Sequence, residues 1–217
     1  MRLFLATTLV LLGTTGIAFT SNATVALGRG VDAPEVEAPN LVAWRDLADK
    51  PCRWLGKKVR VRMQFESELA DWNPYLTRFG RAQFDALRGW SDEQFPWIQT
   101  EFDHPEALLF VRKGTPAQHA LDDAKGYDRF EFTIQVREVF LDTPWAEILD
   151  VQPMSEEITE ATVIHAARAL DLMNQQAWRL AVLELDVALE APLPDPALLE
   201  LKRLRDVCES VNGTPPR

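Results

Sequence analysis

The sequence predicts an α+β protein, with a small sheet or barrel first and an α-helical segment after it. Residues 59–65 alternate between apolar and polar side chains, which is typical of a strand with one buried face. A second alternating stretch lies at 129–140. After Pro153 the apolar residues recur at helical spacing. These three observations place the strands in the middle of the chain and the helices at its end.

The first 23 residues have the pattern of a secretory signal peptide. Arg2 supplies a positive charge, 3–19 is apolar or small, and 21–23 supplies small side chains for a signal peptidase. We expect cleavage after Ala23, with Ala26 as the second choice, and therefore a secreted, periplasmic protein. Threonines and glycines within the apolar stretch disfavour the alternative, an uncleaved membrane anchor.

The rest of the chain is acidic and has no second apolar stretch of membrane-spanning length. Residues 24–40 are expected to form a linker and 213–217 a tail. Cleavage of 1–23 leaves 22 basic and 33 acidic residues. Such a protein repels a phosphate backbone unless its basic residues are clustered, so nucleic acid is not the expected partner. After cleavage no membrane contact is expected.

The segment 41–153 has the strands of a small barrel domain. Turn residues such as Asn73 and Pro74 separate its apolar stretches. The sequence does not decide whether 70–102 forms a lid, an extra hairpin or an Ω-like loop. Within it, 97–102 could be a short strand or a lid. The expected strands lie at 55–67, 84–90, 107–111, 129–140 and 145–151.

Two short helices are expected in the same domain. The first covers 41–47, and Pro51 stops it. The second begins at Thr115, whose hydroxyl is suited to cap it, with Pro116 in its first turn. Gly126 is expected to end this second helix.

This order of elements resembles the oligonucleotide/oligosaccharide-binding (OB) fold. The resemblance rests on the Gly-Lys-Lys-Val-Arg-Val-Arg strand at 56–62, the helix between the third and fourth strands, and the Pro-Trp-Ala-Glu-Ile arm at 144–148. It covers about 50–153 and implies a five-stranded β-barrel with one inserted helix. The extra material at 70–102 departs from a minimal barrel.

Residues 154–212 predict an α-helical hairpin plus a capping helix. Ala169, Leu172, Ala181, Leu185 and Ala188, followed by prolines, resemble one tetratricopeptide-type hairpin. A single such unit cannot bury its apolar face alone, so we expect it to pack on the barrel. A generic helical tail is the equal alternative.

No catalytic constellation stands out in the sequence. His104 has neighbouring acids but lacks the further ligands of a metal site, and no residue three or four positions after His119 or His165 completes a metal-binding motif. Nucleophile and phosphate-loop motifs are missing too. We therefore expect no catalytic residue, no metal and no cofactor.

A basic run on the first long strand is the candidate ligand face. It would combine with tryptophans to form a groove for single-stranded nucleic acid, as in OB-folds that stack bases on aromatic rings. The favoured alternative is a solvated strand whose charges prevent edge pairing, with the tryptophans covering the barrel. The candidate ligand-binding residues are Lys58, Arg60, Arg62, Trp72, Trp90 and Trp97.

The two cysteines and the overall function are left open. In an oxidising compartment Cys52 and Cys208 could form one disulfide, and the slightly favoured alternative is two buried thiols that never meet.

The first functional hypothesis is an exported non-catalytic binding or scaffolding module for an envelope protein or glycan. The second is single-stranded nucleic-acid binding, and the third an unrecognised hydrolase.

Overall fold

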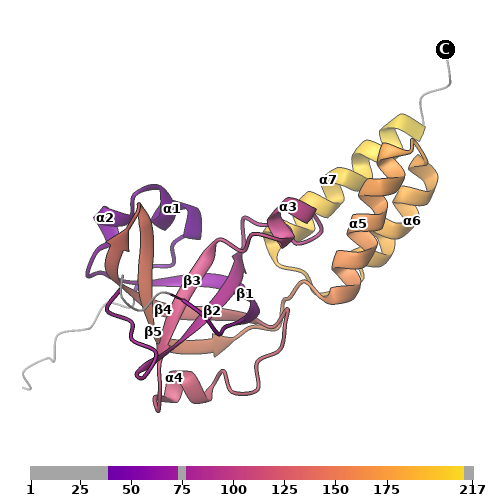
Figure 1. Cartoon of the computed structure of the whole chain (residues 1–217). Coiled ribbons are helices and arrows are strands. Elements are labelled where there is room, and N and C mark those ends of the chain that lie inside the picture. The colour runs from indigo at the N-terminus through magenta and orange to yellow at the C-terminus, as the bar shows by residue number, and fades with distance from the viewer. Residues whose placement is uncertain (1–38, 73–76, 213–217) are drawn as a thin grey trace, which may run out of the picture. The chain divides into compact units, whose positions relative to one another are not determined.

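The computed structural model describes residues 39–72 and 77–212, and it contains a closed five-stranded β-barrel followed by helices (Figure 1). The expected fold class is confirmed. The order around the barrel is β1-β2-β3-β5-β4, with β3 and β5 parallel and the other pairs antiparallel, which is compatible with an OB-like barrel. The strands are β1 Lys58–Leu69, β2 Phe84–Ser91, β3 Ala107–Arg112, β4 Arg129–Phe140 and β5 Thr143–Pro153.

Four of the expected segments lie outside the described residues. They are the signal peptide, most of the linker, the turn at Asn73 and Pro74, and the tail at 213–217. Within the described ranges, no helix is both long and apolar enough to cross a membrane.

The alternation predicted for β1 is correct except at one position. Val59, Val61 and Met63 point into the barrel core and are at most 2% exposed. Gln64 was expected on the solvent side but is 3% exposed. Its side-chain amide bonds to both backbone groups of Ile158, far along the chain, and this pairing is what allows a polar group to be buried there.

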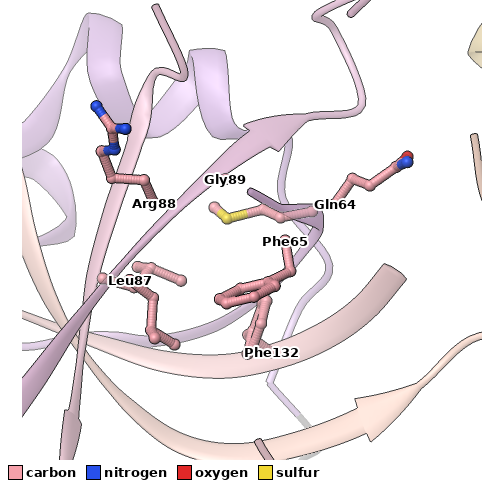
Figure 2. Close-up of a pocket in the computed structure, with 8 residues that line it drawn as sticks. Gln64, Phe65, Leu87, Arg88, Gly89 and Phe132 are labelled. Atoms are coloured by element: carbon pink, nitrogen blue, oxygen red, sulfur yellow. The ribbon is translucent and has the colours of Figure 1, made fainter. Parts of the chain in front are cut away.

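β1 and β2 approach each other unusually closely inside the barrel. A Cβ atom at Gly89 would lie 2.7 Å from the backbone oxygen of Gln64. Beside this contact is an apolar cavity of about 10 Å³, enough for about one water-sized probe. Figure 2 shows Phe65, Leu87 and Phe132 around it, while the polar end of Arg88 points away. Side chains therefore fill the barrel interior around this cavity, which is too small for a ligand.

Short helices flank the barrel, and several differ from the prediction. α1 covers Trp44–Asp49, and Pro51 does not simply end it but begins a second turn, α2 Pro51–Trp54. Proline suits this position because the first residues of a helix need no intrahelical N–H donor. The stretch expected as a strand or lid contains the helical turn α3 Gln99–Phe102.

The inserted helix is shorter than predicted, and the turn of the last hairpin is tighter. α4 covers only Pro116–His119, although the Thr115 hydroxyl accepts the expected capping bond from Gln118 N–H. β4 and β5 are joined by Leu141 and Asp142, both with positive φ, as in a two-residue hairpin turn.

Three helices follow the barrel. They are α5 Glu160–Asn174, α6 Trp178–Ala188 and α7 Asp195–Asn212, and α6 contacts both of the others (Figure 1). Small alanines at their contacts let the helices approach closely. Their shared core also includes Trp97 from the loop after β2, and its other fully buried members include Ala166, Ala181, Leu185 and Leu201. The expected contact between the helices and the barrel domain is therefore present at Trp97, and Gln64 contacts Ile158 in the segment just before α5.

Candidate functional site

Two arginines on the basic face of β1 share one carboxylate on the neighbouring strand β4. Arg60 Nη1 lies 2.8 Å and Arg62 Nε 3.0 Å from the carboxylate oxygens of Glu131 on β4. Burial disfavours the ionised form of Glu131, but the hydrogen bonds from Arg62 and Arg60 outweigh this and lower the pKa of Glu131 below its ordinary value. Of the expected basic residues, only Lys58 is exposed, and no ion pair involves it among the described residues.

The first half of β1, which β2 does not reach, pairs instead with the chain just before α1. The backbone N–H of Arg60 donates to Asn40 and its carbonyl accepts from Val42, both at 2.8 Å. Arg60 Nε also donates to the carbonyl of Pro39 at 2.8 Å. A paired edge does not need charges to keep other strands away, so edge protection is not what explains the arginines here.

The three candidate tryptophans are in the interior. Trp72, Trp90 and Trp97 are 9%, 3% and 3% exposed. The first two donate their indole N–H to backbone carbonyls, and Trp90 is stacked between Phe102 and Tyr127 with centroids 5.5 Å away. Rings buried in this way cover the barrel and the helical core, and they offer no face for a base to stack on.

The cysteines and histidines form no reactive group. Both cysteines are free, and Cys208 is buried as expected. Cys52 was also expected to be buried but is exposed. Burial raises the pKa of the Cys208 thiol. Among the described residues no group of three or more His, Cys, Asp or Glu side chains is placed to hold a metal ion. His104 Nδ1 lies 2.9 Å from the Thr100 carbonyl oxygen, and His165 pairs with Glu184 between α5 and α6.

An aromatic cluster covers the outside of the barrel. Because Leu87, Leu109 and Ala146 face the barrel core, their neighbours in the same strands face outward and form this cluster. Phe79 stacks on Phe110 at 4.1 Å. The cluster contains Trp72, Phe79, Phe84, Ala86 and Phe110, with Leu69, Leu108 and Trp145 packed against it.

An arginine pocket lies at the rim of this cluster and was not predicted from the sequence. Glu147, whose side chain is 7% exposed, accepts from Arg112 Nε at 3.2 Å and from Arg137 Nε at 2.7 Å. The Arg112 guanidinium also lies 4.6 Å from the centre of the Phe84 ring. The surface pocket in front of these groups has a volume of about 280 Å³. The only sign of this pocket in the sequence is a glutamate among the apolar residues of β5. The pocket could not be predicted because Arg112, Arg137 and Glu147 lie on three different strands, β3, β4 and β5, which come together only in the folded barrel.

One helix presents an apolar face to solvent. Ala181, Leu185 and Ala188 turn inward, whereas Leu180, Leu183 and Val187 on the opposite side of α6 are 54%, 61% and 43% exposed. Residues 154–212 carry eleven acidic and five basic side chains, so this face lies on an acidic segment. We call these three residues the α6 face.

The chain matches no protein-family model, no curated protein and no solved structure.

Proposed function

We propose that the chain is an exported, non-catalytic binding or scaffolding module of the cell envelope. The OB-like resemblance of 50–153 and the tetratricopeptide-like resemblance of 154–212 support this, because both kinds of fold present binding surfaces. The signal-like pattern of 1–23 supports export. The observation that carries the proposal is the α6 face.

The α6 face is suited to a protein partner. Single exposed apolar residues are ordinary, but a row on one side of a helix marks an interaction surface when nothing covers it. Leu180, Leu183 and Val187 form such a row, at spacings of three and four residues. Covering a leucine side chain contributes about 1.5–3 kcal/mol, so even three residues supply a useful anchor.

The partner's chemistry follows from the charge around this face. Asp186 on α6 and Glu190 just after that helix are exposed, Asp186 pairs with Arg205 on α7, and the helical segment as a whole is acidic. Complementary charge increases association rate and selects partners. The partner segment is therefore an amphipathic helix with an apolar stripe and basic flanks.

Quantitative co-purification from the source organism tests the proposal. A double variant, Leu180→Glu with Leu183→Glu, should lose a partner that the native chain retains, because two carboxylates then replace the apolar contact. Glutamate is a good helix former and both sites are exposed, so the fold should persist, as circular dichroism would show. Leu141→Glu, at an 82% exposed position on the barrel, is the matched control. An unchanged set of partners in the double variant would refute the α6 assignment.

A further inference from the structure

The pocket on the barrel is lined by two arginines that share one buried carboxylate. Arg137 reaches Glu147 Oε2 through both Nε and Nη2 at 2.7 Å, and Arg112 reaches Oε1 through Nε alone. Within the described part of the chain no acceptor contacts the outer nitrogens of Arg112. These N–H donors are fixed in position by Glu147 below and the Phe84 ring beside them.

The charge of the group is not balanced. Arg112 and Arg137 carry two positive charges, and Glu147 supplies one negative charge between them. The other ionised groups at this rim pair with each other: Lys113 with Asp85 at 3.1 Å, and Arg78 with Glu138 at 4.0 Å. One positive charge therefore remains, which a singly charged anion would neutralise.

A carboxylate is the anion that fits best. Its two oxygens match the planar donors of a guanidinium group, and its single charge matches the charge that remains. The chain as a whole has a formal charge of −10, which disfavours ligands with many negative charges.

We propose that this pocket binds the carboxylate of a uronic acid residue in a glycan. The volume of about 280 Å³ suits a single sugar ring, and the amide of Gln83 at the rim can bond to a hydroxyl. A peptide carboxylate is the weaker candidate, because peptides commonly add a strand to a free sheet edge and the strands here close into a barrel. The site is separate from the α6 face, so a test of glycan binding here does not depend on whether a protein partner binds the α6 face.

A matched pair of sugars tests the inference on the full chain. Methyl β-D-glucuronide and methyl β-D-glucoside differ only in the carboxylate, and binding is followed by the side-chain Nε–Hε NMR signals of Arg112 and Arg137. The glucuronide should shift both signals saturably with a millimolar or tighter Kd, and the glucoside should shift neither. Saturable shifts by both sugars, or by neither, would overturn the inference.

Variants separate the pocket from general charge effects. Arg112→Gln should weaken glucuronide binding at least about tenfold, and Arg112→Lys should restore part of it because the charge returns without the planar fork. Arg62→Gln, which removes a basic residue paired elsewhere, should leave the affinity unchanged. Equal loss in Arg62→Gln and Arg112→Gln would overturn the site. Binding of a short peptide by its free C-terminal carboxylate, with no binding of the glucuronide, would overturn the glycan assignment.

Discussion

Gly89 has no side chain because the backbone of the neighbouring strand fills that space. Gly89→Ala would place a Cβ atom 2.7 Å from the Gln64 carbonyl oxygen, and this backbone cannot move without disturbing β1. We expect a loss of about 1–3 kcal/mol in the free energy of unfolding, measured by urea denaturation. Gly80→Ala, where nothing lies within 4 Å of the added atom, is the control. Equal stability of the two variants would contradict the close approach of the strands.

Glu131 makes the stability of the barrel depend on pH. Its pKa is lowered in the folded state, so its ionised form stabilises the fold above its unfolded-state pKa of about 4.3. That contribution is lost as the pH falls through the lower folded-state pKa. Glu131→Gln should therefore cost about 1 kcal/mol at pH 7, with the difference from the native chain shrinking below about pH 4. A difference that stays constant from pH 7 to pH 3 would contradict the role of Arg60 and Arg62.

At the scale of elements, the regular strands and the caps could be predicted because their signals are local. The alternation of β1 and β4 and the Thr115 cap each depend on side chains only a few residues apart. Gln64 could not be assigned, since its burial depends on Ile158, 94 residues away. The arginine pocket could not be predicted for the same reason, whereas the burial of the tryptophans agrees with the favoured interpretation that they cover the barrel. The residues of the pocket come from strands and loops that only the barrel closure brings together.

The basic face of β1 should not bind single-stranded nucleic acid. Two of its arginines already bond to Glu131, and the three candidate tryptophans are buried. Titration with a mixed-sequence oligonucleotide should therefore leave tryptophan fluorescence unchanged at low and at physiological salt. Saturable quenching that weakens steeply as salt rises would contradict this and restore the nucleic-acid hypothesis.

At the scale of the whole chain, the closed barrel and the helices offer two different surfaces. The barrel carries an arginine pocket of local positive charge in an acidic protein. The helices carry an uncovered apolar row. A scaffold that holds a glycan at one surface and a protein at the other would connect the two, and neither surface requires a catalytic group.

Site-specific photo-cross-linking tests most directly whether a partner protein covers the α6 face. A benzophenone side chain is introduced in place of Leu183, or in place of Leu141 as the control, in the organism that makes the protein. Irradiation should join position 183, but not position 141, to one defined protein of different sequence. No adduct at 183, the same adducts at both positions, or an adduct only with a second copy of this chain would contradict the account.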